Sequence, residues 1–375
     1  MSVKNQSLPC MHLHNNSVCF VNTSMSWGGG EKWHATAAEL CNEVADVTVV
    51  TKPGSKLQQH VSAKGIATFT CKISNISFLN PLKIYQLYRH FKSARYNCIV
   101  LNLPADAKCA GLAAKLAGIK KIIYRRGMPH PIKNNVINRF LFRHVISDVI
   151  VNSEEIGRSI IKNNVNMIPK SKIHIVYNGV NFADYVQVPS IIKRNGDEIV
   201  LGTTGRCVKQ KNQMMLVEMV NTLKQRGHNI KLYIAGTGPL LEPLQQRITE
   251  LHLEECIIPL GFVPDTRPLL AGLDVFVFPS HYEGSANAIV EAMAMGLPVV
   301  SFAVSSMPEM VKHDRTGKLA HYESHDDFTH QVEQLLGNAE QRKWLGDNGK
   351  QLAKTMFDNE EIFKKIKAII LNTHE

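Results

Sequence analysis

Residues 278–300 read FPSHYEGSANAIVEAMAMGLPVV, a stretch with an apolar run at each end and a helical pattern between them. The apolar run before Pro279 favours a buried strand, and the spacing of residues 286–295 favours a helix. A second apolar, β-branched run begins at Val299. A strand, a helix and another strand in this order form one repeat of a parallel α/β sheet.

Two acidic residues, Glu283 and Glu291, stand in this stretch with seven residues between them. Glu283 falls in the turn, whereas Glu291 has mostly apolar neighbours. A carboxylate on a buried helix needs a partner, and carboxylates accept paired hydrogen bonds from neighbouring hydroxyls. We therefore predict that one acid contacts a sugar and the other a ribose; two solvated acids are the alternative. The N–H groups at the helix start would face the same ligand, from Gly284, Ser285, Ala286, Asn287 and Ala288.

The alternation of strand and helix patterns extends over most of the chain. Helix-length segments separate apolar, strand-like runs at 18–23, 47–51, 68–73, 98–103, 121–124, 148–151, 173–177, 199–203, 230–235, 256–260, 275–278 and 299–302. The alternation weakens at residues 186–198, which mix Pro, Gly and charge as a linker does. The pattern predicts an α/β protein with two doubly wound, Rossmann-like domains, residues 1–188 and 189–355. Their ligand is expected in a cleft at the carboxyl ends of the strands.

Charge is distributed unevenly along the 375 residues, whose formal net charge is +11. The first 190 residues hold 23 basic and 9 acidic side chains, and the remainder hold 20 and 23. The basic half indicates an anionic partner, such as a membrane surface or a phosphorylated substrate, or else a merely solvated basic surface. Nucleic acid is disfavoured because no nucleic-acid-binding motif accompanies the charge. Eight cysteines without a C-x-x-C pair, a polar N-terminus and short apolar runs predict a cytoplasmic protein with reduced thiols.

Two glycine-containing turns are candidates for phosphate binding. Residues 201–212 read LGTTGRCVKQKN, in which Gly205 permits a tight turn between Arg206 and a preceding strand, and Lys211 precedes a helix. Such a turn offers backbone N–H groups and cations to an anion, although two exposed basic residues would look the same. Gly28, Gly29 and Gly30 also follow a strand. Neither they nor residues 236–238 complete the G-x-G-x-x-G fingerprint, so a dinucleotide dehydrogenase is disfavoured.

The stretch with the two acids resembles the signature of the retaining glycosyltransferases of family four, which have the GT-B fold. In that signature Glu, seven residues and Glu precede an Ala-rich helix end and G-x-P-V-V, here residues 296–300. Residues 28–30, 177–181, 205–212 and 260–263 resemble further family motifs in the same order. The resemblance covers most of the chain. It implies a final helix at about 356–371, with the segment 356–375 packing back on the first domain.

The resemblance also implies roles for individual residues. Arg206 and Lys211 would neutralise the donor diphosphate, Glu283 would contact the donor sugar, and Glu291 would bind the ribose. Phe262 and Val263 would lie beside the nucleobase, and no metal or other cofactor would be needed. The chain departs from the family where a histidine is common, because residues 123–131 read IYRRGMPHP. Arg126 and His130 are the candidate catalytic residues in this segment. The identity of a catalytic base stays open.

The implied activity is transfer of a sugar from a nucleotide-diphosphate sugar, with UDP favoured, in lipopolysaccharide or other cell-surface glycan synthesis. The acceptor would be an anionic or lipid-linked glycan. Residues 81–95 and 132–145 combine basic and aromatic side chains, as helices on an anionic membrane surface do. Peripheral contact at the inner face of the cytoplasmic membrane is therefore expected, with packing on a sheet as the alternative. A nucleotide-sugar epimerase and a non-catalytic sugar- or nucleotide-binding scaffold are the competing functions.

Overall fold

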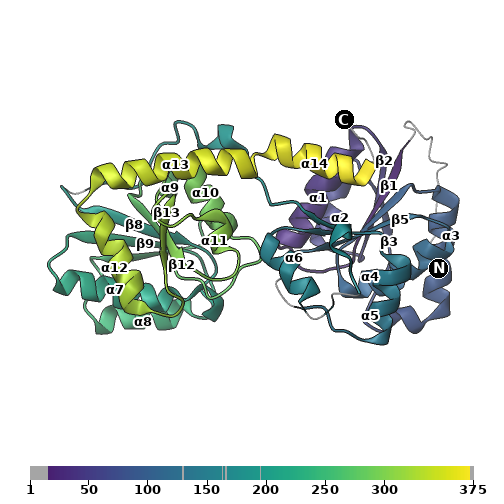
Figure 1. Ribbon diagram of the computed structural model, residues 1–375, viewed down its shortest axis with the longest axis horizontal. Coiled ribbons are helices and arrows are strands. Elements are labelled where there is room, and N and C mark those ends of the chain that lie inside the picture. The colour runs from purple at the N-terminus through teal and green to yellow at the C-terminus, as the bar shows by residue number, and fades with distance from the viewer. Residues whose placement is uncertain (1–15, 129–130, 163, 165–166, 195, 372–375) are drawn as a thin grey trace. The chain divides into compact units, whose positions relative to one another are not determined.

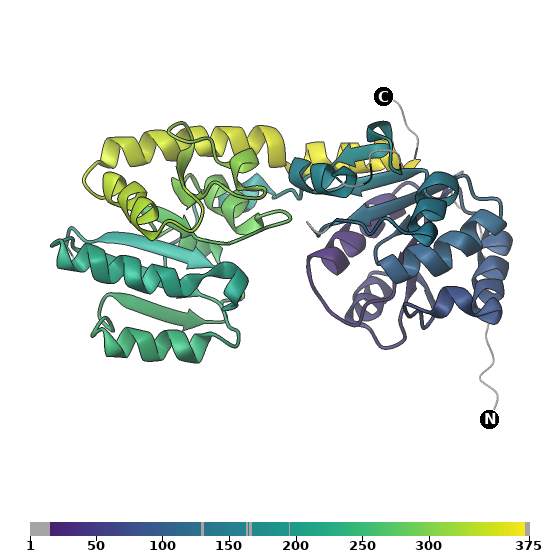
Figure 2. The ribbon, with the colours of Figure 1, turned by 60° about the horizontal axis from the view of Figure 1, so that its bottom comes forward.

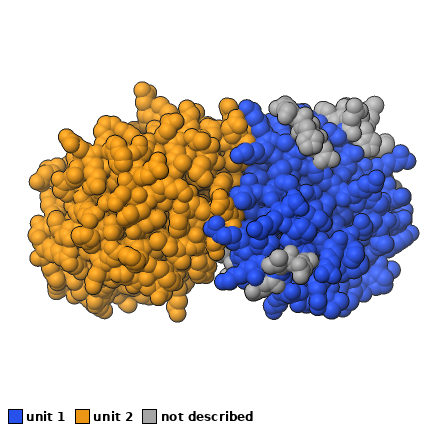
Figure 3. Space-filling view, viewed as in Figure 1, with its two compact units in different colours: residues 1–152, 156–176, 363–375 blue, residues 153–155, 177–362 orange. Residues whose placement is uncertain are grey.

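The computed structural model describes residues 16–371 except 129–130, 163, 165–166 and 195. Contacts between Cα atoms divide the chain into two units, coloured separately in Figure 3. Unit 1 contains residues 1–152, 156–176 and 363–375, and unit 2 contains residues 153–155 and 177–362. Each unit is described separately below.

Unit 1 is built on a seven-stranded, fully parallel sheet with the order β3-β2-β1-β4-β5-β6-β7. Its strands are β1 (Ser17–Asn22), β2 (Asp46–Thr51), β3 (Ala67–Thr70), β4 (Cys98–Leu101), β5 (Lys121–Arg126), β6 (Asp148–Val151) and β7 (Ile173–Ile175). Its helices and helical turns are α1 (Gly29–Asn42), α2 (Lys56–Ala63), η1 (Ser77–Leu79), α3 (Pro81–Ala94), α4 (Pro104–Leu116), α5 (Val136–Phe140), η2 (Leu141–Val145), α6 (Glu154–Ile161) and η3 (Lys170–Lys172), joined by the end of α14 (Asn359–Leu371).

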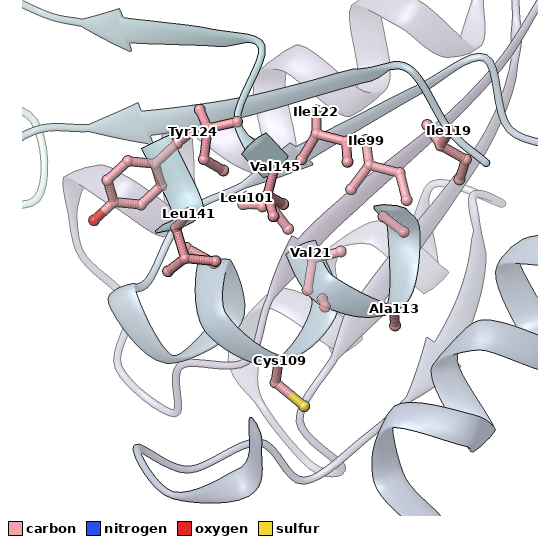
Figure 4. Packing of buried hydrophobic residues seen from close by; sticks show 14 of the residues in the cluster. Val21, Ile99, Leu101, Cys109, Ala113, Ile119, Ile122, Tyr124, Leu141 and Val145 are labelled. Carbon is pink, nitrogen blue, oxygen red and sulfur yellow. The ribbon is translucent and has the colours of Figure 1, made fainter. Parts of the chain in front are cut away.

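Helices cover both faces of this sheet because its central strands are apolar on both sides (Figures 1 and 2). Successive residues of a strand point to opposite faces. Phe20 of β1 meets His34 of α1 edge to face, whereas the neighbouring Val21 belongs to the cluster that α4 covers. Figure 4 shows that cluster, in which Ile99 and Ile122 of the sheet face Cys109 and Ala113 of α4.

Unit 2 is built on a six-stranded parallel sheet with the order β10-β9-β8-β11-β12-β13. Its strands are β8 (Ile199–Thr204), β9 (Ile230–Ala235), β10 (Ile257–Gly261), β11 (Val275–Phe278), β12 (Val299–Phe302) and β13 (Gly317–Ala320). Its helices and helical turns are η4 (Phe182–Tyr185), η5 (Lys209–Lys211), α7 (Gln213–Gln225), α8 (Leu241–Glu250), α9 (Arg267–Leu270), α10 (Asn287–Met295), α11 (Met307–Met310), α12 (His325–Leu336), α13 (Ala339–Phe357) and the start of α14. The sheet order reverses between β8 and β11, so the carboxyl ends of these two strands flank the switch point where α/β proteins bind ligands.

The two parallel α/β sheets confirm the predicted fold class, with differences at the ends of elements. Residues 136–145 form a short α-helix, α5, that widens into a π-helical turn, η2. The predicted final helix at 356–371 is wrong in its start, because α13 ends at Phe357 and α14 begins at Asn359. Asp358 is extended between them, where its neighbours exchange backbone hydrogen bonds with Val180. No helix in the described part of the chain is long and apolar enough to cross a membrane.

Candidate active site

The turn after β8 places Gly205 and Arg206 at the carboxyl end of the central strand of unit 2. Gly205 has a φ of +144°, a conformation that other residues rarely adopt, and Arg206 is exposed. The Gln213 side chain at the start of α7 donates a 3.0 Å hydrogen bond to the Arg206 carbonyl. The turn therefore presents a fixed backbone and an exposed cationic side chain next to the start of a helix, as anion-binding sites do.

The turn after β9 holds the Arg206 turn in place. The Gly205 amide donates to Ala235 and the Cys207 amide to Thr237, both at 2.9 Å. Gly236 lies so close that a Cβ atom there would stand 1.8 Å from the Gly205 carbonyl oxygen. Residues 236–238 do not complete a G-x-G-x-x-G nucleotide-binding fingerprint. Their glycines instead permit the close packing of two βα turns.

An ion pair joins two of the predicted site residues. The Lys211 Nζ lies 2.7 Å from the Glu283 Oε1, and both side chains are largely buried. The Ser280 hydroxyl donates to the same carboxylate oxygen at 2.6 Å, and the Lys211 ammonium lies 4.6 Å from the centre of the Phe278 ring. The carboxylate and the ammonium thus meet at the carboxyl ends of β8 and β11, although 72 residues separate them in sequence.

The backbone around Glu283 is fixed by residues that the sequence analysis missed. Its carbonyl accepts hydrogen bonds from the Ser305 hydroxyl at 2.7 Å and the Ser306 hydroxyl at 3.2 Å. On the other side, the Gln210 side chain donates to the Tyr282 carbonyl, and the Gln210 carbonyl accepts from the His281 amide. Hydroxyl and amide side chains are common everywhere in the chain, so only three-dimensional contact distinguishes these residues.

Helix α10 begins at Asn287, four residues after Glu283. Gly284, Ser285 and Ala286 form the approach, and Asn287 and Ala288 open the helix, as predicted. The first N–H groups of any helix lack carbonyl partners within it, and they carry the positive end of the helix dipole. The Asn287 side chain also accepts a 3.0 Å hydrogen bond from Asn178, which ties α10 to the segment that follows β7.

Glu291 lies one turn into α10, at a different place from Glu283. Its carboxylate accepts a 3.4 Å hydrogen bond from the Thr266 hydroxyl. Burial, and then the charge of Glu291, raise the pKa of the Tyr185 hydroxyl. Glu291 therefore faces the β10–α9 connection and η4, with hydroxyls as neighbours, whereas Glu283 faces the Lys211 turn.

Phe262 and Val263 follow β10 at the edge of this group. Phe262 is 73% exposed, and Val263 is half-buried against the core of unit 2. Gly261 has a φ of +66°, which turns the chain at the end of the strand. An exposed aromatic ring held by a turn at a strand end offers a flat surface on which a base can stack.

The remaining candidates lie in unit 1. Gly28 caps α1, and Gly29 and Gly30 form its first turn, where the Glu31 carboxylate accepts a 2.8 Å hydrogen bond from the Gly28 amide. A Cβ at Gly30 would stand 3.1 Å from the Asn102 side chain. The glycines thus permit a tight turn at the start of α1, and their role in phosphate binding stays a prediction.

Arg125 and Arg126 end β5 in different environments. Arg125 is only 5% exposed and lies 5.4 Å from the Trp33 ring; burial lowers its pKa to about 10, while the Glu31 charge opposes the shift. The half-buried Arg126 donates a 3.3 Å hydrogen bond to the Tyr124 hydroxyl. Asp148, at the start of β6, lies 2.8 Å from His174. His130 lies outside the described residues.

Unit 2 thus brings together one group of predicted residues: Gly205, Arg206, Lys211, Phe262, Val263, Glu283, the start of α10 and Glu291. Gly28, Gly29, Gly30 and Arg126 belong to unit 1. Within the described ranges, no three His, Cys, Asp or Glu side chains gather as a metal site requires. The group in unit 2 combines cations for an anion, carboxylates for hydroxyls and an aromatic ring, which suits a nucleotide sugar.

Two parallel α/β units with such a group define a glycosyltransferase of the GT-B fold that uses a nucleotide-sugar donor. Two family models match successive parts of the chain: "Glycosyltransferase Family 4" matches residues 27–184, and "Glycosyl transferases group 1" matches residues 187–352. The chain belongs to the family-four glycosyltransferases. This result confirms the resemblance on which the residue roles were assigned.

Relatives with curated names are glycosyltransferases. An uncharacterized glycosyltransferase of Methanocaldococcus jannaschii is 30% identical over 49% of this chain and 50% of its own length. A capsular polysaccharide biosynthesis glycosyltransferase of Staphylococcus aureus is 24% identical over 60% of this chain and 61% of its own length. The matches therefore span only about half to three-fifths of these two relatives.

A third relative matches almost end to end. It is the Campylobacter jejuni N-acetylgalactosamine-N,N'-diacetylbacillosaminyl-diphospho-undecaprenol 4-alpha-N-acetylgalactosaminyltransferase, 26% identical over 90% of this chain and 95% of its own length. Among solved structures, Anabaena HepE in complex with UDP has a TM-score of 0.81 and 19% identity, and covers 95% of this chain and 100% of its own. At this identity the structural likeness concerns the fold.

Proposed function

We propose that this glycosyltransferase retains the anomeric configuration, uses a UDP-sugar without a metal, and builds a cell-surface glycan on a lipid-linked acceptor. The observation that carries the proposal is the Lys211–Glu283 pair beside the Arg206 turn and the start of α10. The names of the staphylococcal and Campylobacter relatives support the surface glycan and the lipid-linked acceptor. The UDP complex of HepE supports the donor base.

The chemistry requires stabilisation of charge on the leaving group. When the bond between the sugar and the phosphate breaks, negative charge grows on the diphosphate and positive charge on the sugar. Fixed cations and helix N–H groups lower the energy of that transition state because they need no reorganisation. Arg206, Lys211 and the first turn of α10 would act on the diphosphate, and the Glu283 carboxylate would contact the sugar. Glu291 would hold the ribose hydroxyls, and Phe262 would stack on the base.

The test is a thermal-shift screen of UDP, GDP, ADP and CDP in a chelator, because a ligand that binds the native state raises its melting temperature. We expect UDP to give the largest shift. Lys211→Ala should weaken UDP binding about ten- to hundredfold, since a charge-assisted contact is lost. The exposed Lys209 on the same turn η5 provides the matched control, and Lys209→Ala should leave UDP affinity nearly unchanged. Equal affinities in the two variants would remove the phosphate role from Lys211.

We also propose that unit 1 contacts an anionic membrane. A groove of about 700 Å³ runs between η1, α3, the end of α4 and α5, lined by Phe78, Tyr85, Tyr88, Leu112, Leu116 and Phe140 among others. Beside it Leu82 is 77% exposed, and Lys83, Arg89 and Lys115 supply positive charge on the same helices. Exposed apolar side chains with cations on the same helices suit the boundary between lipid headgroups and acyl chains.

Sedimentation with anionic vesicles tests the contact. Wild-type protein should sediment at low salt and less at high salt, because the headgroup attraction is screened. Leu82→Asp should reduce the bound fraction, whereas Val44→Asp, at another exposed apolar residue of unit 1, should not. Equal sedimentation of the two variants would count against the groove as the contact surface.

A further inference from the structure

Four polar side chains lie at the carboxyl edge of the unit 1 sheet, on one of its two faces. Strands β1, β4, β5 and β6 are neighbours in the sheet, and each has an apolar residue near its end that belongs to the cluster under α4. These are Val21, Leu101, Tyr124 and Val151, three of which Figure 4 labels. Successive residues of a strand point to opposite faces. The residues that follow, here called the polar row, therefore point to the face on which Phe20 meets α1: Asn22, Asn102, Arg125 and Asn152.

Arg125 is the cation of the polar row, and it is buried. Its guanidinium lies 5.4 Å from the Trp33 ring, and its pKa of about 10 keeps it charged at neutral pH. No described residue accepts a hydrogen bond from this guanidinium or forms an ion pair with it. The Glu31 carboxylate, which acts on Arg125 through its charge, accepts its hydrogen bond from the Gly28 amide. A buried charge without a hydrogen-bond acceptor is costly, and a ligand that supplies an acceptor removes that cost.

Two glycines leave space beside the guanidinium. A Cβ atom at Gly127 would stand 2.6 Å from the Arg125 Nη1, and one at Gly30 would stand 3.5 Å from the same atom. Both glycines are half-buried. The φ of Gly127 lies outside the left-handed region, so the absence of a side chain, and not an unusual backbone, distinguishes this position. A side chain at either glycine would fill the space that a ligand needs to reach the guanidinium.

The asparagines of the polar row carry hydrogen-bonding groups that the described part of the protein does not use. Asn22 is fully buried and its Oδ1 accepts from the Ser24 amide, but its Nδ2 has no partner among the described residues. The Oδ1 of the buried Asn152 likewise has none there. The Asn102 Nδ2 lies 3.1 Å from the place of a Cβ at Gly30, the glycine that also borders the guanidinium. Buried amides are usually paired, so unpaired ones beside an unpaired cation indicate a polar ligand.

The start of α1 limits the charge of that ligand. The helix has 14 residues, and its first N–H groups carry the positive end of the helix dipole. Together with Arg125 they favour an anion, whereas the nearby Glu31 offsets part of the positive charge. A single negative charge therefore fits better than a phosphate ester, which carries nearly two. A carboxylate also matches the planar fork of an arginine, and amide side chains both donate to and accept from sugar hydroxyls.

We infer that the polar row binds an acidic sugar of the acceptor, with Arg125 paired to its carboxylate and the asparagines bonded to its hydroxyls. The inference rests on the transferase function proposed above, and it names the class of acceptor sugar that unit 1 recognises. The polar row is separate from the donor group, all of whose residues belong to unit 2. A neutral sugar with the same ring would leave the buried Arg125 unpaired, so the site discriminates against it.

The test uses the full chain saturated with UDP, so that the donor group is already occupied. The probes are the methyl glycosides of glucuronic, galacturonic and mannuronic acid, each compared with its neutral hexoside. Isothermal titration should show at least one uronide binding about tenfold or more tightly than its neutral counterpart, because a charge-assisted pair is gained. No preference for any uronide would overturn the inference. Glucose 6-phosphate should bind more weakly than that uronide, and tighter binding would overturn the carboxylate in favour of a phosphate.

Arg125→Gln should abolish the preference for the uronide and leave the affinity for the neutral hexoside nearly unchanged. Arg139→Gln is the matched control, since it removes the same charge from an exposed position on α5 of the same unit. Retention of the preference in Arg125→Gln, or an equal loss in Arg139→Gln, would overturn the inference.

Gly127→Ala provides a second variant should Arg125→Gln fold poorly. It keeps the arginine but fills the space beside its Nη1, so it should weaken the uronide at least about tenfold. Unchanged uronide affinity in Gly127→Ala would remove this approach to the guanidinium. UDP affinity is measured separately in each variant. Absence of UDP binding to the wild type would count against the proposed function, whereas UDP binding without a uronide preference would count against the polar row alone.

Discussion

Glu283 has two roles. It is the ion-pair partner of a buried lysine, and it places a carboxylate near the start of a helix. It is 7% exposed, and the charge of Lys211 balances its own. Its carboxylate also accepts a hydrogen bond from the Ser280 hydroxyl. Breaking a buried ion pair by removing one partner leaves a charge without compensation. The choice of substitution therefore decides whether an experiment reports on chemistry or on folding.

Glu283→Gln keeps the shape of the side chain and removes its charge. We expect transfer to fall at least about a hundredfold, since the sugar loses its charged contact. UDP affinity should persist or rise, because Lys211 no longer shares its charge with a carboxylate. Initial rates and titration with UDP measure the two effects, and Glu242→Gln, at an exposed acid of unit 2, is the control. Unchanged transfer in Glu283→Gln would refute a catalytic role.

Asp106 predicts a pH dependence of stability. Burial raises the pKa of its carboxyl to about 7 against its hydrogen bonds from Thr23 and Leu103. The folded state therefore binds a proton that the unfolded state has released, and this contribution to stability declines as the pH rises from about 4 to 7. One group changes stability by at most about 1.4 kcal/mol per pH unit.

The comparison with Asp106→Asn isolates this effect. Buried His34 acts in the opposite direction: burial, aided by the Arg125 charge, lowers its pKa to about 3, so that its contribution is lost as the pH falls below its unfolded value. Subtracting the unfolding free energy of Asp106→Asn from that of wild type cancels the histidine. The difference should shrink from pH 4 to pH 7 in urea titrations; a difference independent of pH would contradict the raised pKa.

At the scale of elements, the donor group depends on two βα turns that are packed together. Gly236 has a φ of +157°, and a Cβ there would overlap the Gly205 carbonyl. Gly236→Ala should lower the free energy of unfolding of unit 2 by roughly 3–5 kcal/mol and abolish UDP binding. Gly227→Ala separates backbone strain from steric overlap, because Gly227 also has a positive φ, +85°, but has open space around it. Its cost should be nearer about 1 kcal/mol, with UDP binding intact. Equal losses in the two variants would show that backbone strain alone matters.

The sequence predicts the elements better than it predicts their contacts. Runs such as 98–101 and 275–278 are apolar on both faces, which parallel strands between two helix layers require. Strand β13 was missed because GKLA is short and half polar. The two acids and the Arg206 turn stand out through spacing and resemblance.

At the scale of the whole molecule, the chain leaves unit 1 after residue 176 and returns to it at residues 363–375. Residues from Phe363 onward belong to that unit, and Ile366 and Ile370 of α14 are buried there. Lys367 adds an ion pair with Glu43, 2.8 Å from its carboxylate. Unit 1 is thus completed by residues far from the rest of it in sequence, which makes its folding depend on the full chain.

Ile366→Asp tests this dependence. A charge placed at a side chain that is 2% exposed should lower the free energy of unfolding of unit 1 by about 3 kcal/mol or more. Ala368→Asp adds the same charge to an exposed position of the same helix and should change little. Chemical denaturation, monitored by hydrogen exchange of the backbone amides in β1 and β2, distinguishes the two variants. Equal protection in both variants would mean that α14 is dispensable to unit 1.

The packing of Gly236 against Gly205 also bears on transplanting the site. The Arg206 turn takes its conformation from amides, carbonyls and glycines of the next βα turn, so residues 199–213 alone do not encode it. A graft of that segment into another parallel sheet would deliver the side chains without their geometry. The smallest segment that can be transplanted contains both strands and both turns, residues 199–240. A design that uses the Arg206 turn must therefore also include the βα turn that packs against it.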